Sequence, residues 1–160
     1  MMILQESSMV PDEMFKTVIE YAPLVSIDLI AMHKDKVLLG KRVNKPAFGY
    51  YFTTGGIVRK NETLANAMKR LAKLELGIEL VDEPNFIGVF QHFYDDSIYE
   101  NVSTHYVNLG YKLKVPNLKN LPKEQHSEYR WFSVEELLQS DEVHAYVKDY
   151  FKKINIGENK

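Results

Sequence analysis

The pattern of apolar and polar positions along the chain predicts strands mixed with a few helices. Runs rich in β-branched and aromatic residues between polar turns are typical of strands, whereas apolar residues three and four apart favour helices. The expected strands are residues 24–32, 37–43, 49–54, 85–94, 102–115 and 129–133. The expected helices are residues 11–21, 62–76 and 134–140, and a last helix capped by Ser140 or Asp141. This order indicates an α+β protein, an α/β/α layered fold with a mixed β-sheet flanked by helices.

Length and composition fit a single domain over residues 1–160, with an N-terminal helical segment at 1–22 and a frayed tail at 155–160. Hydrophobic residues make up 45% and charged residues 26%, as in globular proteins. The net charge of −2 favours neither nucleic acid nor a membrane surface as a partner. The chain has no cysteine, which excludes a disulfide framework. The N-terminus lacks a basic leader with a long apolar core, so we expect a cytoplasmic protein.

Residues 55–78, GGIVRKNETLANAMKRLAKLELGI, predict a glycine turn, a charged loop and a helix. Asn61 is expected to cap this helix and Gly77 to end it. The spacing G-x5-E-x7-R-x4-E-x-G-I resembles the Nudix box of nucleoside-diphosphate hydrolases. The residues that match are Gly56, Glu62, Arg70, Glu75, Gly77 and Ile78. The alternative is an amphipathic surface helix whose buried stripe is Leu64, Met68, Leu71 and Leu74.

The Nudix box is depleted of carboxylates in this chain. Two of the three acidic positions of the full box hold Leu71 and Leu74, so Glu75 remains alone. Attack of hydroxide on an anionic phosphorus needs several hard cations. One carboxylate is compatible with a single Mg²⁺ on a diphosphate, because Mg²⁺ binds through one or two carboxylates together with substrate phosphates.

Several polar side chains stand inside the predicted strands. Asp28 lies in the apolar run LVSIDLIA, where a carboxylate is costly unless it has a partner or a task. The alternative for Asp28 is a strand end or edge in solvent. Gln91, His92, His105, Tyr106, Gln125 and His126 lie in aromatic surroundings. A single histidine of this kind is more often structural, and we read His33 and His144 in that way. Three histidines beside a phosphate-type motif favour a site.

Taken in order, six strings resemble the GDP-mannose mannosyl hydrolases, an aberrant Nudix family. They are LVSIDLI, LLGKR-x-N-x-PA-x-GY, the depleted box, QHFYDD, THYV-x-LGY and EQH-x-x-YRW, between Pro23 and His144. The resemblance implies hydrolysis of GDP-mannose or GDP-glucose at the anomeric carbon, with inversion, to GDP and free hexose. It also implies one Mg²⁺ per active site, with Mn²⁺ as a substitute, and a homodimer.

The resemblance also implies roles for the residues that match the family. The metal ligands would be the Gly55 carbonyl, Glu75 and Gln125. Among the catalytic residues, His126 would be the general base, Arg42 would meet the leaving diphosphate, Arg70 would add positive charge, and Asp28 would stabilise charge on the sugar. Substrate binding would involve His92, Tyr106, Arg42 and Asp28. A histidine base predicts activity that rises with pH near ~6.5, the ordinary imidazole pKa.

Two positions depart from the family. Thr54 and Ile57 stand where the family has a proline and an arginine, and Arg59 or Lys60 could replace that arginine only if the loop brings them close. Two alternative functions stay open. One is a conventional Nudix pyrophosphatase that yields a nucleoside monophosphate and a sugar phosphate. The other is a non-catalytic module that binds a nucleotide sugar.

Overall fold

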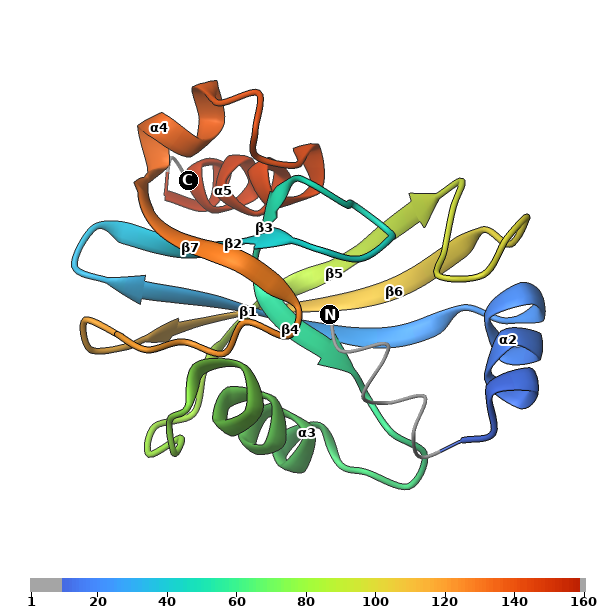
Figure 1. Ribbon diagram of the computed structural model, residues 1–160. Coiled ribbons are helices and arrows are strands. Elements are labelled where there is room, and N and C mark those ends of the chain that lie inside the picture. The colour runs from blue at the N-terminus through green and yellow to red at the C-terminus, as the bar shows by residue number, and fades with distance from the viewer. Residues whose placement is uncertain (1–9, 159–160) are drawn as a thin grey trace.

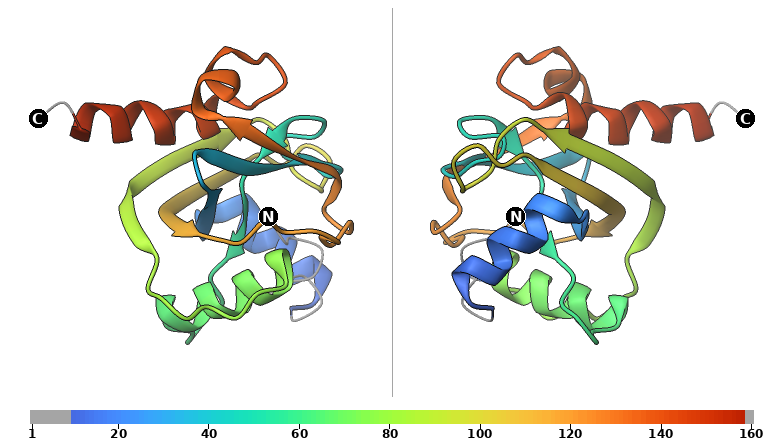
Figure 2. Two further views of the ribbon diagram at one scale, coloured as in Figure 1. Left: turned by 90° about the vertical axis from the view of Figure 1, so that its left-hand side faces the viewer. Right: turned by 90° about the vertical axis from the view of Figure 1, so that its right-hand side faces the viewer.

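The computed structural model describes residues 10–158, and side chains as far as residue 152. One mixed sheet lies between α4 and α5 on one face and α3 on the other, as predicted (Figures 1 and 2). The strands in this part of the chain are β1 (Leu24–His33), β2 (Lys36–Arg42), β3 (Tyr51–Phe52), β4 (Thr54–Ile57), β5 (Asn85–Tyr94), β6 (Thr104–Lys114) and β7 (His126–Ser133). The helices are α2 (Asp12–Tyr21), α3 (Leu64–Leu71), the π-helical turn η1 (Ala72–Leu76), α4 (Val134–Gln139) and α5 (Ala145–Glu158).

Strand β1 is the centre of the sheet. It pairs in parallel with β6 along nearly its whole length, and antiparallel with β4 and β2 on its other edge. Beyond these neighbours, β6 pairs with β5, and β2 pairs with β3 and β7. Because β1 is flanked on both edges and covered on both faces, its side chains reach the deepest part of the protein.

The side chains of β1 alternate between two cores, as the period of a strand requires. Ile27 and Leu29 pack under α3, in a cluster that also contains Met68 and Leu71. Ile30 faces the opposite way, in the cluster that receives α2 and α5. Ser26 and Asp28 share the α5 side with Ile30, so two polar groups enter that core.

The helix of the depleted Nudix box differs from the prediction. It begins at Leu64, and the cap is the side chain of Thr63, which accepts a hydrogen bond from the backbone N–H of Asn66 at 3.1 Å. Asn61 instead lies in the preceding loop with a positive φ of 65°. The predicted buried stripe is wrong at Leu64, which is 41% exposed. The helix then widens into η1 before Gly77 ends it in the left-handed conformation, with φ 69°.

The glycine turn expected at Gly55 and Gly56 is wrong. Both glycines lie in strand β4, where they pair with Asp28 and Ile27 of β1. The run 49–54, expected as one strand, forms β3 and only the first residue of β4.

Other elements also begin at residues that differ from the prediction. Strand β7 begins at His126, three residues before the predicted start, because that residue pairs with the end of β2. The last helix begins at Ala145, so neither Ser140 nor Asp141 caps it; Nδ1 of His144 accepts from the N–H of Tyr146 at 3.1 Å. The predicted capping box is confirmed, because the side chains of Ser133 and Glu136 each accept a hydrogen bond from the backbone N–H of the other residue.

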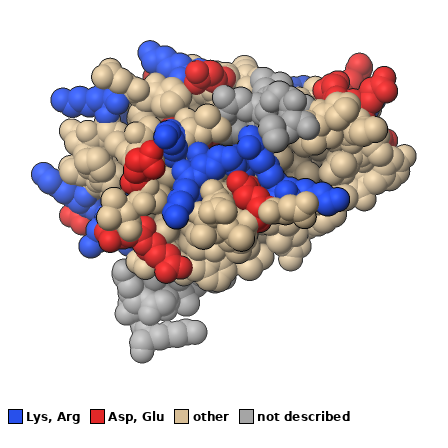
Figure 3. All heavy atoms as spheres, turned by 90° about the horizontal axis from the view of Figure 1, so that it is seen from below, with Lys and Arg blue, Asp and Glu red and all other residues tan. Residues whose placement is uncertain are grey.

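The ends of the chain are only partly described. The backbone of α5 is helical to Glu158, and the rest of the tail expected to fray, residues 159–160, lies outside the described residues, as do residues 1–9. Within the part that is described, no helix combines the length and the apolar character that a membrane span needs. Figure 3 views the α3 side of the molecule and shows lysine and arginine side chains across the middle of that face, with acidic side chains beside them.

Candidate active site

Strand pairing brings most of the predicted site residues together in pairs. A register partner is the residue directly opposite on the neighbouring strand, and its side chain usually lies on the same face. The register pairs are Asp28 with Gly55, Arg42 with His126, and His92 with Tyr106. Each pair joins two neighbouring strands, and the three pairs together draw site residues from six strands.

Arg42 is the positive charge in the middle of this group. Its side chain is almost fully buried, and burial lowers its pKa. Tyr106, Glu75, Tyr94 and Asp28 act in the opposite direction and raise this pKa. Its Nε donates to the carbonyl of Pro46 at 3.3 Å, so the loop after β2 holds it in place.

His126 is neutral and has one free ring nitrogen. Burial, with a smaller contribution from the charge of Arg42, lowers its pKa to about 2. Tyr129 donates its hydroxyl hydrogen to the carbonyl of Pro122, so at 3.3 Å its oxygen can only accept from Nδ1–H of His126. Nε2 consequently carries a lone pair, and it is buried without a partner among the described residues. An imidazole titration near pH 6.5 is therefore not expected for His126 in the free protein.

Gly40 makes room for the His126 ring, a feature that the sequence analysis missed. A Cβ at this position would lie 2.5 Å from Cγ and 2.6 Å from Cδ2 of His126. No real side chain tolerates such distances, so the ring rests directly on the backbone of β2. The glycine in LLGKR was the available signal, because glycine inside a strand often marks a close approach.

Glu75 comes to the site from the π-helical turn. Its carboxylate is buried, and burial raises its pKa although Arg42 works against this. Oε1 has no hydrogen-bond partner in the described part of the chain. Single π-turns are rare and recur at functional sites. Leu71, which replaces an acidic residue of the box, is fully buried in the core under α3 and strengthens packing there.

The three expected metal ligands supply oxygen donors that suit a hard cation. Strand β4, which carries Gly55, contacts the π-turn of Glu75. A Cβ at Gly55 would lie 2.1 Å from the carbonyl oxygen of Ile27, so only glycine fits there. Oε1 of Gln125 accepts from Asn44 Nδ2 at 3.3 Å. In the described part of the chain, no three or more His, Cys, Asp or Glu side chains converge as metal ligands. The unpartnered Oε1 of Glu75 fits a cation that is completed by carbonyl, amide and phosphate oxygens.

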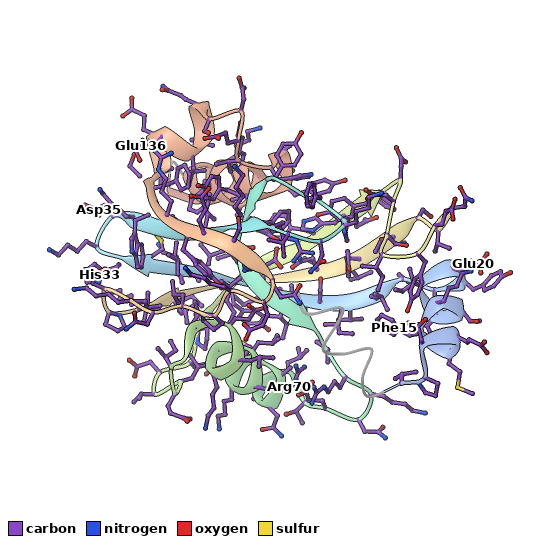
Figure 4. The ribbon with its side chains drawn as sticks, in the orientation of Figure 1. Phe15, Glu20, His33, Asp35, Arg70 and Glu136 are labelled. Atoms are coloured by element: carbon purple, nitrogen blue, oxygen red, sulfur yellow. The ribbon has the colours of Figure 1, made fainter. Side chains whose placement is uncertain are left out.

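Arg70 fixes the charged loop between β4 and α3 by hydrogen bonds. Its Nε and one terminal nitrogen donate to the carboxylate of Glu62 at 2.7 and 2.9 Å, and the same terminal nitrogen donates to the carbonyl of Ile57 at 2.8 Å. Glu62 also accepts from the N–H of Arg59 at 2.9 Å. Figure 4 shows Arg70 beside the loop that precedes α3. These contacts favour a positioning role for Arg70; direct charge support to the substrate stays a prediction.

Asp28 and His92 lie on the α5 side of the sheet. Asp28 is buried and accepts a hydrogen bond from Tyr150 of α5, so the alternative of an aspartate in solvent is wrong. The His92 ring stacks on Tyr146, with 4.3 Å between centroids and 6° between planes. Both contacts come from tyrosines of α5. The sequence pattern indicates only that these tyrosines belong to the apolar side of the helix.

The other histidines have structural surroundings. Nδ1 of His33 lies 2.9 Å from the carbonyl of Val115. Nδ1 of His144 accepts from the N–H of Tyr146 at the start of α5, which agrees with the structural role expected for both histidines. His105 stacks on the exposed ring of Phe93 on the opposite face of the sheet from its neighbour Tyr106. Of the three histidines that suggested a site, His92 and His126 lie in it and His105 does not.

Thr54 and Ile57 are the two positions that depart from the resembled family, and their side chains contact backbone or apolar groups. The hydroxyl of Thr54 donates to the carbonyl of Leu29 at 3.2 Å. Ile57 belongs to the core beneath α2. Arg59 and Lys60 line a cavity of about 320 Å³ against α2. An arginine in place of Ile57 would have to leave that core.

The fold, the glycine pair in β4, the loop held by Arg70 and the buried Glu75 together define a Nudix hydrolase domain. The NUDIX domain family matches residues 22–153, and the chain belongs to this family. It is 36% identical over 147 residues to the low-salt glycan biosynthesis protein Agl8 of Haloferax volcanii, covering 91% of each chain.

Two solved structures show the same fold. The MutT protein of Methanosarcina mazei Go1 superposes with a TM-score of 0.71 at 23% identity, covering 86% of this chain and 97% of that one. The NUDIX domain of Shewanella oneidensis NrtR, solved with ADP ribose, gives 0.64 at 16% identity, covering 94% and 97%. At these identities the likeness concerns the fold alone.

Proposed function

We propose that this protein hydrolyses a GDP-hexose, GDP-mannose or GDP-glucose, at the anomeric carbon, and releases GDP and free hexose with inversion. The observation that carries the proposal is that the box keeps one carboxylate, the buried Glu75, and that the site holds a buried imidazole, His126, whose Nε2 has no partner among the described residues. A Nudix box with one carboxylate is poorly suited to attack on phosphorus, whereas it can support departure of a diphosphate from carbon. The relative from Haloferax volcanii carries glycan biosynthesis in its name, which agrees with a nucleotide-sugar substrate.

Mg²⁺, or Mn²⁺ in its place, would be held by the carboxylate of Glu75, the carbonyl of Gly55 and the amide oxygen of Gln125. When bound there, the cation supplies positive charge to the diphosphate. Arg42 and the hydroxyl of Tyr106, which is buried without a partner among the described residues, would donate to the same leaving group. GDP is a weak base, so it can leave without a general acid when such donors face its developing charge.

His126 would be the base that activates water. A proton passes from the water to Nε2 while the water oxygen bonds to the anomeric carbon and the bond from that carbon to the diphosphate breaks. Tyr129 keeps Nδ1 protonated, so Nε2 is the nitrogen that accepts. The transition state resembles an oxocarbenium ion, and the buried carboxylate of Asp28 would stabilise its positive charge.

Product analysis in ¹⁸O-labelled water tests the reaction. GDP-mannose and GDP-glucose are each incubated with the protein and Mg²⁺. The products are then separated, and mass spectrometry measures which of them carries ¹⁸O. We expect unlabelled GDP and a hexose that carries the label. GMP with a hexose phosphate would mean a pyrophosphatase and overturn the proposal; binding of the sugar nucleotide without turnover would favour a binding module. The homodimer and the cytoplasmic location expected from the sequence stay predictions.

A further inference from the structure

Asn108 places a buried amide in the middle of the sheet, on the side that faces α5. It stands in β6 between two register partners, Ser26 of β1 and Phe90 of β5. Its side chain is fully buried, and its Nδ2 lies 3.4 Å from Nδ1 of His92. Neither Oδ1 of Asn108 nor Oγ of Ser26 has a partner within residues 10–158. An amide in such a place is costly unless it has a task.

The ring of His92 is held on several sides. It stacks on Tyr146, and the rings of Phe52 and Tyr94 meet it edge-on at 6.1 and 6.4 Å between centroids. These contacts fix the plane of the ring but leave open which nitrogen carries the proton. The only hydrogen bond described for the ring is the one between Nδ1 and the amide of Asn108.

An amide nitrogen can only donate, so a His92 ring that faces Nδ2 of Asn108 must accept at Nδ1. In the neutral ring the proton then sits on Nε2. We infer that Asn108 is a positioning residue that holds His92 in the Nε2–H tautomer, so that His92 presents a hydrogen-bond donor to the hexose. The hexose part of this inference rests on the proposed function.

The ligand class follows from the neighbouring groups. The negative charge of Asp28 acts on His92, so a carboxylate and an imidazole share this side of the sheet. A donor at Nε2 and an acceptor at Asp28 together match a sugar hydroxyl, which accepts one hydrogen bond and donates another. Asn108 therefore contributes to the choice between hexoses that differ in one hydroxyl, although it acts through His92.

The tautomer is measured first, in the free protein. Nitrogen-15 NMR at alkaline pH distinguishes the two ring nitrogens of a neutral histidine, and His92→Gln identifies the signals of His92 among the five histidines. We expect Nε2–H in the natural chain. Asn108→Asp should move the proton to Nδ1, because a carboxylate only accepts. Asn117→Asp, the same change at an exposed loop residue, should leave His92 unaltered. An Nδ1–H tautomer in the natural chain, or no change in Asn108→Asp, overturns the inference.

The second measurement is the ratio of kcat/KM for GDP-mannose and GDP-glucose. Asn108→Asp should change this ratio by roughly 10-fold or more, since a site built to hydrogen-bond a hydroxyl discriminates strongly. An unchanged ratio with a changed tautomer overturns the role in hexose choice. If no GDP-sugar is hydrolysed at all, the proposed function fails, while the NMR result still decides whether Asn108 sets the tautomer.

Discussion

The hydroxyl of Tyr150 donates a hydrogen bond to Oδ2 of Asp28, across 122 positions of sequence. Both side chains are buried, and burial raises the pKa of Tyr150, so the hydroxyl keeps its proton. The carboxylate that would stabilise charge on the sugar is thus held by the last helix of the chain.

Tyr150→Phe removes this donor and leaves a buried carboxylate with one partner fewer. We expect the free energy of unfolding to fall by about 1–3 kcal/mol, measured by urea titration. Tyr21→Phe is the matched control, because Tyr21 is 79% exposed and such a change costs about 0.5 kcal/mol or less. Equal losses in the two variants would show that the Tyr150 hydroxyl does not stabilise the fold.

The half-buried ion pair between Arg70 and Glu62 should stabilise the fold more than the exposed pair between Lys73 and Glu79. The side chains of Arg70 and Glu62 are 16% and 14% exposed, whereas those of Lys73 and Glu79 are 72% and 78% exposed. Arg70→Met should lower the free energy of unfolding by about 2 kcal/mol or more, because it leaves the carboxylate of Glu62 poorly solvated and without its partner. Lys73→Met should cost about 0–1 kcal/mol.

Double-mutant cycles for the two pairs separate these effects. The first pair should show a coupling of about 1 kcal/mol or more, and the second close to none. A small coupling for Arg70 and Glu62 would mean that they do not clasp the loop.

Gly40→Ala should displace the ring of His126. The new Cβ would lie 2.5 Å from the ring, so strand or ring must shift, and we expect a loss of about 1–3 kcal/mol in unfolding free energy. In a His126→Ala background the ring is gone, and the same change should cost much less. Equal costs in both backgrounds would mean that the strain does not come from His126.

Acid should destabilise the protein through His126. Its pKa of about 2 in the folded chain lies below the ordinary value near ~6.5, so below about pH 6 the unfolded chain binds a proton that the folded chain does not. Stability therefore falls as the pH drops, by up to about 1.4 kcal/mol per pH unit for this one group. His126→Gln should show a shallower decline in urea titrations between about pH 6 and pH 4. An identical decline would place the His126 pKa near its ordinary value.

Glu75→Gln separates metal binding from stability. Without metal, the variant should be more stable by about 0.5–2 kcal/mol, because a buried carboxylate is replaced by a neutral amide of the same shape. The natural chain should gain thermal stability on addition of Mg²⁺, and Glu75→Gln should gain little. Glu79→Gln, an exposed position just beyond the same helix, should respond to Mg²⁺ like the natural chain. A full Mg²⁺ response in Glu75→Gln would remove Glu75 from the metal site.

The layered fold and most of its elements could be predicted from local patterns along the chain. Runs rich in β-branched and aromatic residues between polar turns located β1, β2 and β5 closely, because such residues favour strands. The spacing of Gly56, Glu62, Arg70 and Glu75 pointed to the Nudix family for a physical reason as well. The ion pair of Arg70 with Glu62 holds the loop that follows the glycine pair of β4.

The way in which the site residues come together could not be predicted from local patterns, because it depends on long-range packing. Register pairs such as Arg42 with His126 join strands that local pattern cannot align, because pairing depends on contacts across the whole sheet. The π-turn at Glu75 and the burial that lowers the pKa of His126 likewise arise from packing around them. Tyr150, Tyr129 and Gly40 looked like core and strand residues in the sequence. Each of them contacts a polar residue of the site in the folded protein, namely Asp28 for Tyr150 and His126 for Tyr129 and Gly40.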